Sequence, residues 1–514
     1  MNGAESLVQT LLKAGVDTCF TNPGTSEMHF VRAIGNESKM RSVLGLFEGV
    51  CTGAADGYAR MTGKPAVTLL HLGPGLANGT ANIHNARRAH SPMINLVGDH
   101  ATYHLQYDAP LASDVNGLAR AYSDWVKSAS TADNLAADGA QAIQAALQKP
   151  GQISTLIVPA DCAWNQAGSG TEPLPVPAPP GVAGDRIDKI AHILKSKKKS
   201  IIVIGGPAND EQAILALDKI AQASGTTVLY ETFNARLRRG AGHPKFDKVA
   251  YFVEMAQEQF KDCEHVITVG AKSPVAFFAY PDKPSTPLPT GCETHVLADP
   301  HEDVITALDD LVQALDAQAL QPRLQEEQRP DILSGALSPK SIGFALGALL
   351  PENVIIVDEA ATSGGPPTGL TEAIPGHDWL QLTGGSIGYG LPVATGAAVA
   401  CPDRKVVCLH GDGGAMYTIQ ALWTQARENL NVVNVIFSNR KYQILQVELM
   451  RVGATNPNQK TLDMLDIDKP DLNFQQLARG MGVDASRATT ADEFNEQLKR
   501  ALAAEGPQLI EAVF

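Results

Sequence analysis

Basic residues, paired cysteine motifs and long apolar runs are scarce in this chain of 514 residues. Lys and Arg number 41 against 55 Asp and Glu, and the net charge of −14 argues against nucleic acid or an anionic membrane as a partner. No apolar run approaches the roughly 18 residues that a membrane span needs. The seven cysteines are dispersed without a CxxC pair, which is typical of reduced thiols in the cytosol, and no targeting segment is evident. We therefore expect a cytoplasmic protein.

The length predicts about three domains, and two stretches rich in proline and polar residues divide the chain. Residues 168–184 read GSGTEPLPVPAPPGVAG, and residues 320–340 are equally unsuited to a helix or a central strand. They separate an N-terminal segment (1–170), a middle segment (184–320) and a C-terminal segment (340–514). Each segment alternates β-branched runs with helical patterns, which predicts three α/β domains with doubly wound parallel sheets.

Short apolar runs mark the strands that we expect in these sheets. Their nearly continuous hydrophobicity is typical of parallel strands that are buried on both faces. The expected strands are Thr18–Thr21, Ala66–His71, Met93–Gly98 and Ile153–Pro159, then Ser200–Gly205, Thr227–Tyr230, His265–Gly270 and His295–Ala298, and finally Val354–Asp358, Lys405–His410 and Asn431–Ser438.

Two polar residues follow neighbouring strands of the C-terminal segment. Asp412 lies directly after one apolar run, and Asn439 lies directly after the next. Because ligands of open parallel sheets bind beyond the carboxyl ends of the strands, both side chains are expected at one edge. Carboxylate and amide oxygens are ligands that Mg²⁺ prefers, and the flanking Gly411, Gly413 and Gly414 allow a bulky diphosphate to approach the backbone. A plain strand–helix turn is the alternative, and the Asn at this spacing argues against it.

The run from Gly411-Asp412-Gly413 through Asn439 resembles the diphosphate motif of the thiamine diphosphate enzymes of the pyruvate decarboxylase–acetolactate synthase superfamily. The resemblance covers nearly the whole chain, and it implies a pyrimidine-binding, a middle and a diphosphate-binding domain, in that order. It also implies thiamine diphosphate and Mg²⁺ as cofactors. By this resemblance Asp412, Asn439 and the carbonyl of Lys441 would hold the metal, and Tyr442 would join the cofactor site.

Glu48 is the expected partner of the cofactor's pyrimidine ring. It lies among apolar residues and opens the run E-x-x-x-x-G-x-A-D-G-Y-A-R (48–60), which resembles the family pattern for the glutamate that bonds a pyrimidine nitrogen and promotes formation of the ylide. A partly exposed glutamate at a helix start is the alternative interpretation. The segment GGSIGYGLP (384–392) resembles the family stretch that clasps the pyrimidine. By that match the carbonyl of Gly385 would accept a hydrogen bond from the pyrimidine amino group, and Ile387 would be the wedge between the cofactor rings. A plain glycine-rich turn is the alternative interpretation.

In this family each active site is built from residues of two chains. Glu48 and Asp412 lie in different segments, so by the resemblance they would come to one site from two chains. The resemblance therefore implies at least a homodimer, and a homotetramer is expected. We expect no FAD, because Gly205-Gly206-Pro207 lacks the third spaced glycine of a dinucleotide fingerprint.

His71 bears on the reaction, because it closes a strand just before LGPGLANG (72–79) and would face the cofactor. Benzoylformate decarboxylase carries an acid–base histidine in the corresponding stretch, whereas acetolactate synthases resemble T-S-G-P-G there. A core histidine bonded to the backbone is the alternative. Thr25, in NPGTSE, matches a family serine that orients the substrate carboxylate, with Ser26 one position away. That decarboxylase also has a second histidine in its middle domain, where this chain reads AKSPVAFFAYP (271–281).

Three hypotheses about function follow. The first is a decarboxylase that converts a 2-oxo acid to an aldehyde and CO₂ through an enamine, with Glu48, His71 and Thr25 as catalytic residues. The second is an acetolactate synthase-like carboligase that joins the enamine to another 2-oxo acid or aldehyde. The third is a non-catalytic paralogue, against which the intact Glu48, Asp412 and Asn439 weigh. The apolar residues of 271–281 and of the helix after Tyr442 (Ile444, Leu445, Leu449) favour an aromatic or branched substrate.

Overall fold

The N-terminal sheet is entirely parallel, as its apolar runs predict. The computed structural model describes residues 1–514, and this first sheet has the strand order β2-β1-β3-β4-β6-β5. Alternate residues of its central strands face two separate apolar cores, so that Val67 lies in one and Leu70 in the other. Its strands are β1 (Thr18–Asn22), β2 (Arg41–Leu44), β3 (Ala66–Leu70), β4 (Met93–Asp99), β5 (Trp125–Ser128) and β6 (Ile153–Pro159), and its helices are α1 (Gly3–Lys13), α2 (Met28–Gly35), α3 (Glu48–Thr62), α4 (Leu72–Arg88), α5 (Val115–Tyr122), α6 (Leu135–Leu147) and α7 (Ala160–Trp164).

The middle sheet is also parallel, with the order β10-β8-β7-β11-β12. Residues 167–183 and 320–334, which lead into it and away from it, contain no helix or strand, as expected for the proline-rich connections. The sheet contains β7 (Ser200–Ile204), β8 (Thr227–Tyr230), β10 (Asp247–Lys248), β11 (His265–Val269) and β12 (Glu293–Ala298), with α8 (Gly184–Lys195), α9 (Glu211–Ser224), α10 (Val253–Gln259) and α11 (Val304–Ala314).

The C-terminal sheet has the order β17-β18-β16-β15-β13-β14-β9, and only β9 is antiparallel. That strand, Leu237–Arg239, comes from the middle segment and pairs with β14, where the Arg239 guanidinium lies 4.0 Å from the ring centroid of Trp379. The other strands are β13 (Ile355–Glu359), β14 (His377–Gln381), β15 (Val406–Gly411), β16 (Val432–Ser438), β17 (Asp484–Ala488) and β18 (Gln508–Val513), and the helices are α12 (Pro339–Leu349), α13 (Gly365–Leu370), α14 (Gly390–Ala400), α15 (Asp412–Ala415), α16 (Ala421–Arg427), α17 (Gln443–Arg451), α18 (Gln459–Leu462), α19 (Phe474–Gly480) and α20 (Ala491–Ala503).

The prediction of three doubly wound α/β units is confirmed, and each expected strand lies within two residues of an observed one. The strands that the sequence did not reveal are short or polar. For example, β14 reads HDWLQ and buries His377, Asp378 and Gln381. No helix in the chain combines the length and the hydrophobicity that a membrane crossing requires.

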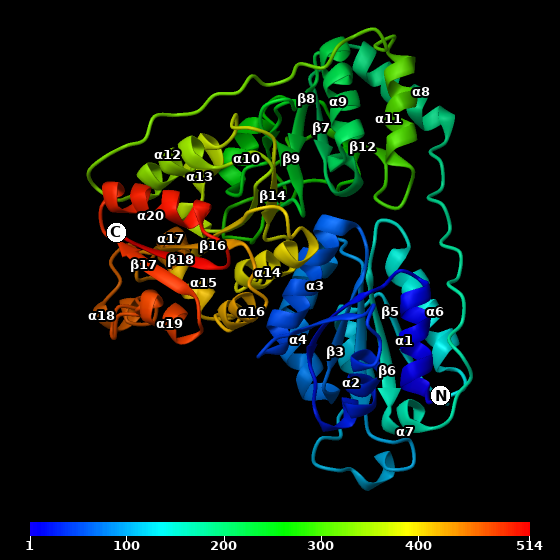
Figure 1. Cartoon of the computed structure of the whole chain (residues 1–514). Coiled ribbons are helices and arrows are strands. Elements are labelled where there is room, and N and C mark those ends of the chain that lie inside the picture. Colours follow the sequence, from blue (N-terminus) through cyan, green and yellow to red (C-terminus); the bar gives the residue numbers. More distant parts are fainter.

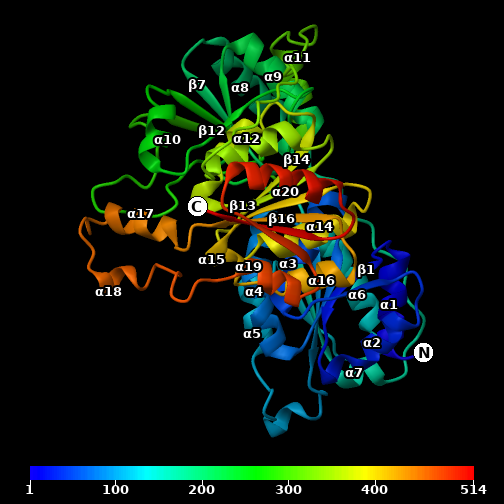
Figure 2. The same ribbon diagram turned by 60° about the vertical axis from the view of Figure 1, so that its left-hand side comes forward.

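Helices α3 and α14 join the N-terminal and C-terminal sheets and lie side by side in both views (Figures 1 and 2). Two glycines set how closely they approach. A Cβ on Gly396 would lie 1.8 Å from the carbonyl oxygen of Ala54, and one on Gly57 would lie 2.1 Å from that of Val393. The two backbones are therefore in direct contact, and neither position has room for a side chain.

Replacement of Gly396 by Ala should push the two helices apart. We expect a destabilisation of about 1–3 kcal/mol or more, which is typical of overpacking in a close-packed core. Thermal unfolding of the purified protein measures it. The matched control is Gly35→Ala at the end of α2, where a Cβ would meet no atom within 4 Å. Equal melting temperatures for the two variants would contradict this description of the contact.

Candidate active site

Asp412 and Asn439 lie together at the carboxyl edge of the C-terminal sheet. They follow β15 and β16, which are paired in parallel register. One carboxylate oxygen of Asp412 accepts a hydrogen bond from the backbone N–H of Arg440 at 2.6 Å, and the other accepts from Gly413 at 2.8 Å. Asp412 is only 3% exposed. Burial raises the pKa of Asp412, and the backbone N–H groups partly oppose this rise. The hydrogen bonds to its carboxylate come from backbone N–H groups and not from a basic side chain. A divalent cation would supply the charge that this buried carboxylate lacks.

The turn that contains Asp412 is tightly packed. A Cβ on Gly413 would lie 2.3 Å from the ring of Tyr442, and one on Gly414 would lie 2.8 Å from a carboxylate oxygen of Glu359. Gly411 is under no comparable constraint, since its nearest contact would be 3.7 Å away. The helix that begins at Asp412 is a single turn of four residues.

The segment that carries Lys441 is fixed by its backbone. The backbone N–H of Lys441 donates a hydrogen bond to the side-chain oxygen of Asn439 at 3.2 Å. On either side, the carbonyl of Arg440 accepts from Ile467 at 2.9 Å, and the N–H of Tyr442 donates to Leu465 at 2.8 Å. Residues 440–442 therefore lie beside Asp412 in a defined position.

Glu359, which sequence reasoning missed, holds the loop that contains Gly385 and Ile387. Its carboxylate accepts hydrogen bonds of 2.6–2.7 Å from the N–H groups of three consecutive residues, Gly388, Tyr389 and Gly390. The same carboxylate lies 3.1 Å from Nε2 of His410, and both side chains are buried. Burial alone would lower the pKa of His410, but the Glu359 carboxylate outweighs it and raises this pKa. The sequence feature that could have identified Glu359 is its position at the end of β13, at the same sheet edge as Asp412.

The loop itself presents Gly385 to solvent and leaves Ile387 half-buried. Gly385 has a φ of 75°, and a Cβ there would lie 2.9 Å from the ring of Phe277. The middle segment thus reaches the loop through Phe277, whose ring packs against those of Phe278 and Tyr251 at centroid distances of 4.7 and 5.4 Å.

Glu48 begins α3 and is 8% exposed, so it is both a helix-start residue and a buried one. Its carboxylate accepts a hydrogen bond of 3.0 Å from Asn78 of α4. Asn82, one turn further along α4, donates to the carbonyls of Gly49 at 2.8 Å and Gly388 at 3.4 Å. The start of α3 is therefore bridged to the loop of the C-terminal sheet within one chain.

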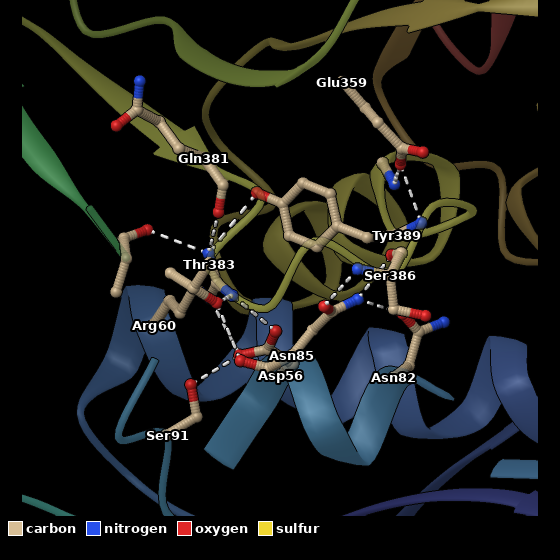
Figure 3. A network of polar contacts seen from close by, with 12 residues as sticks. Asp56, Arg60, Asn82, Asn85, Ser91, Glu359, Gln381, Thr383, Ser386 and Tyr389 are labelled. Atoms are coloured by element: carbon tan, nitrogen blue, oxygen red, sulfur yellow. Dashed lines mark hydrogen bonds and ion pairs between the residues drawn. The ribbon is translucent and has the colours of Figure 1, made fainter. Parts of the chain in front are cut away.

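A buried polar network extends this bridge (Figure 3). Arg60 forms a two-pronged ion pair with Asp56 at 2.7 and 2.8 Å, and it also donates to the carbonyl of Gln381 at 2.7 Å. Asn85 donates to the carbonyl of Ser386 at 2.8 Å and accepts from the Ser386 N–H at 3.2 Å. Arg60 of α3 and Asn82 and Asn85 of α4 thus hold this loop and the neighbouring strand in place from the N-terminal sheet.

His71 follows β3 and is held by the segment 22–27. Its Nδ1 lies 2.8 Å from a carboxylate oxygen of Glu27 and 3.2 Å from the hydroxyl of Ser26. Glu27 is fully buried and also accepts from the N–H of Gly24 at 2.8 Å. Since a carboxylate only accepts, Nδ1 carries the proton, and Nε2 is the atom available to a ligand. Sequence reasoning missed Glu27 as the partner.

The hydroxyl beside His71 belongs to Ser26 and not to Thr25, which is exposed. The chain spacing alone could not distinguish the two, because residues 25–27 form a 3₁₀ turn that points successive side chains in different directions. The sequence feature that indicates the close approach of this turn to His71 is Gly24, where a Cβ would lie 2.2 Å from the His71 ring.

A cavity of about 720 Å³ lies apart from these residues. It lies between the N-terminal and middle sheets and is lined partly by the turn after β7, including Gly206 and Pro207, and by Arg236 and Arg238. Its size is that of a small-molecule pocket, but it contains none of the candidate catalytic residues.

Comparisons with known proteins point to one family. The model "Thiamine pyrophosphate enzyme, N-terminal TPP binding domain" matches residues 1–122, and the corresponding "C-terminal TPP binding domain" matches residues 371–512. The chain is 50% identical over 516 residues to the "Putative acetolactate synthase large subunit IlvX" of Mycobacterium tuberculosis, covering 100% of this chain and 99% of the relative. It is 29% identical over 537 residues to benzoylformate decarboxylase of Pseudomonas aeruginosa, covering 98% and 97%. Among solved structures, a thiamine diphosphate-dependent 4-hydroxybenzoylformate decarboxylase of Rhodococcus jostii superposes with a TM-score of 0.87 at 25% identity, covering 99% and 98%.

Replacement of Glu359 by Gln should loosen the loop, because three N–H groups lose a charged acceptor and His410 loses its counter-charge. We expect a loss of about 3–5 kcal/mol of stability, as when one partner of a buried ion pair is removed. Because the pKa of His410 is raised, its share of the stability is present below about pH 6.5 and is lost as the pH rises through the folded pKa.

Thermal unfolding of both proteins over a pH series checks this. The difference between wild type and variant should shrink as the pH rises. The exposed Glu352→Gln serves as the control. A pH-independent difference would mean that His410 is not coupled to Glu359.

Proposed function

We propose a reaction for this chain on the premise that it belongs to the thiamine pyrophosphate enzymes, in the group that contains acetolactate synthases and benzoylformate decarboxylases. The reaction is the non-oxidative decarboxylation of a 2-oxo acid to an aldehyde and CO₂. The observation that carries this proposal is the imidazole of His71, held by a buried carboxylate at the carboxyl edge of the N-terminal sheet. We propose thiamine diphosphate and Mg²⁺ as cofactors, and no FAD.

Asp412, Asn439 and the carbonyl of Lys441 would hold Mg²⁺, and the backbone at Gly413 and Gly414 would lie against the diphosphate. The fit rests on the donor atoms: a buried carboxylate without a basic neighbour, and an amide oxygen beside it. Gly411 and Tyr442 complete the wall of this part of the site, since the Tyr442 ring packs on the glycine turn. When bound, thiamine diphosphate supplies an electron sink for the bond that releases CO₂.

Glu48 would hold a proton against the pyrimidine ring. Its burial and its hydrogen bond from Asn78 keep the carboxylate in one orientation. Gly385 would offer its carbonyl to the pyrimidine amino group, and the half-buried Ile387 would set the angle between the rings. Glu359 fixes both residues indirectly, through the three N–H groups that follow them in the loop.

His71 would transfer protons to and from the substrate through Nε2. Glu27 is a positioning residue, because it fixes the tautomer of His71 and its negative charge stabilises the protonated ring. Thr25 is the hydroxyl that we propose for the substrate carboxylate, because it is exposed, whereas the Ser26 hydroxyl is engaged by Glu27 and His71.

The substrate would have an aromatic or branched side chain. Phe277 packs beside Gly385 and belongs to a cluster of rings with Phe278, Tyr251 and Phe233. Tyr280 contributes less directly, because its hydroxyl is bonded to Glu448 of α17. Two of the similar proteins are named as decarboxylases of benzoylformate or its 4-hydroxy form, which agrees with an aromatic substrate.

We propose that the protein forms at least a homodimer, and that two such dimers assemble into a homotetramer. The apolar residues of α17, which include Ile444, Leu445 and Leu449, support this, because that helix buries none of its residues within one chain. A neighbouring copy would cover this surface and bring a second set of site residues to the cofactor.

A carboligase is the second candidate, in which the decarboxylated unit joins a second 2-oxo acid or an aldehyde. The specific observation in its favour is the 50% identity to a relative that is named as an acetolactate synthase. The stretch GPGLANG (73–79) also resembles a synthase sequence. The cofactor residues are the same for both reactions, and only the acceptor pocket differs.

Neutralising Asp412 and Glu48 should impair two different properties of the protein, cofactor binding and turnover. Asp412→Ala should abolish the thermal stabilisation that Mg²⁺ and thiamine diphosphate give the protein, whereas Glu48→Gln should keep most of it and lose turnover. Thermal shift and CO₂ release measure the two effects. The exposed Asp403→Ala is the control. Stabilisation in Asp412→Ala equal to that of the wild type, or full turnover in Glu48→Gln, would refute the respective assignment.

Loss of the imidazole tests the decarboxylase directly. His71→Ala should lower kcat for CO₂ release by about 10²–10⁴-fold, the usual contribution of a general acid–base, without weakening cofactor binding. Glu27→Gln should change the pH profile of kcat, which a purely structural role would not do. His301→Ala, at an exposed site, is the control. Undiminished decarboxylation by His71→Ala would remove the histidine from the mechanism.

A further inference from the structure

Three side chains with metal-binding chemistry meet at the amino-terminal end of β11 and β12. Strand β12 is labelled in the green upper part of Figure 1. His265 is the first residue of β11, and Glu293 and His295 are the first and third residues of β12. The two strands are parallel, with His265 opposite Glu293 and Ile267 opposite His295. Since alternate residues of a strand share a face, all three side chains lie on the same face of the sheet. The turn after β7 lies at the opposite ends of the strands.

The donor atoms already have the spacing of metal ligands. Nδ1 of His265 lies 3.2 Å from Nε2 of His295, and that nitrogen lies 3.6 Å from a carboxylate oxygen of Glu293. All three atoms fall within 4.8 Å of one another. Ligands bound to tetrahedral Zn²⁺ at about 2.0–2.1 Å lie roughly 3.3 Å apart, which matches the two shorter distances.

A hydrogen bond between the two rings does not explain the whole arrangement. One proton between the ring nitrogens satisfies that contact, but if Nε2 of His295 is the acceptor its single lone pair points to Nδ1 of His265, and no proton lies between His295 and the Glu293 carboxylate 3.6 Å away. Both rings are buried, at 8% exposure each, whereas the Glu293 side chain is 67% exposed and is free to approach or leave. A cation bound between the three atoms satisfies every contact at once.

We propose that His265, Glu293 and His295 bind a divalent transition-metal ion, with Zn²⁺ favoured, and that water completes its coordination. Two imidazole nitrogens and one carboxylate are a usual donor set for Zn²⁺, whereas Mg²⁺ prefers oxygen ligands alone. The ion would join the edge strand β12 to β11. This site is separate from the candidate active site, so that it stands or falls independently of the proposed reaction.

Charged groups and thiols near the cluster affect how metal binding can be tested. The ammonium of Lys189, on α8, acts on His295 and opposes a bound cation, while the Glu293 carboxylate favours one. Two thiols precede the same strands: Cys263 donates to the carbonyl of His265 at 3.2 Å, and Cys292 is adjacent to Glu293 in the chain. A test must therefore separate histidine ligation from cysteine ligation.

The experiment is a titration of the protein with Co²⁺ in the presence of saturating Mg²⁺ and thiamine diphosphate, followed by displacement with Zn²⁺. Saturating Mg²⁺ keeps the site at Asp412 filled. We expect one Co²⁺ per chain, with visible absorption that Zn²⁺ abolishes. Glu293→Gln and His295→Gln should each weaken binding by roughly tenfold or more, and Lys189→Gln should strengthen it. His192→Gln, an exposed histidine on α8, should change nothing.

Because Glu293 is exposed, the variant Glu293→Gln should fold normally, which its melting temperature without Co²⁺ and Zn²⁺ will verify. The proposal is overturned if no Co²⁺ binds, or if binding persists unchanged in both Glu293→Gln and His295→Gln. It is equally overturned if Cys292→Ser abolishes binding while His295→Gln does not. None of these outcomes depends on turnover of a 2-oxo acid, so a failure here is distinct from a failure of the proposed function.

Discussion

A buried ion pair within α3, between Arg60 and Asp56, holds the guanidinium that joins the two sheets of the candidate active site. Both side chains are only 1% exposed, so that their desolvation is costly unless every donor finds an acceptor. The guanidinium meets this condition through Asp56 and through the carbonyls of Gln381 and Ala235 on the other side of the interface. Burial alone would lower the pKa of Arg60, but Asp56 raises it and keeps the charge in place. The position of α3, and with it that of Glu48, depends on this pair.

Three other buried carboxylates divide the work of the site according to their partners. Glu359 is saturated by three backbone N–H groups and His410, and it serves to shape a loop. Glu27 accepts from the imidazole of His71, as well as from the Gly24 N–H and the Ser26 hydroxyl, and it gives His71 its orientation. Asp412 faces backbone N–H groups and no basic side chain, and it is the one whose environment calls for a cation. The same functional group thus holds a loop, orients a proton carrier or binds a metal, depending on what surrounds it.

Much of this arrangement could be predicted from the sequence, because it depends on local signals. The apolar runs revealed the central strands, and the residues directly after them, such as Asp412, Asn439 and His71, fell at the expected sheet edges. What could not be predicted depends on contacts between distant parts of the chain. Asn85 meets Ser386 across 301 positions, and Phe277 meets Gly385 from a different domain. The strand β9 was invisible because its three residues form a strand only when they pair with β14 of another sheet.

The most direct test of the central claim is the identity of the products. The protein would be incubated with Mg²⁺, thiamine diphosphate and a panel of 2-oxo acids that includes pyruvate and benzoylformate, and the carbon skeletons of the products would be determined by NMR. The account predicts free aldehyde and CO₂ in equal amounts, with an aromatic or branched 2-oxo acid as the better substrate. An acetohydroxy acid or a 2-hydroxy ketone as the main product would contradict it and assign the chain to the carboligases.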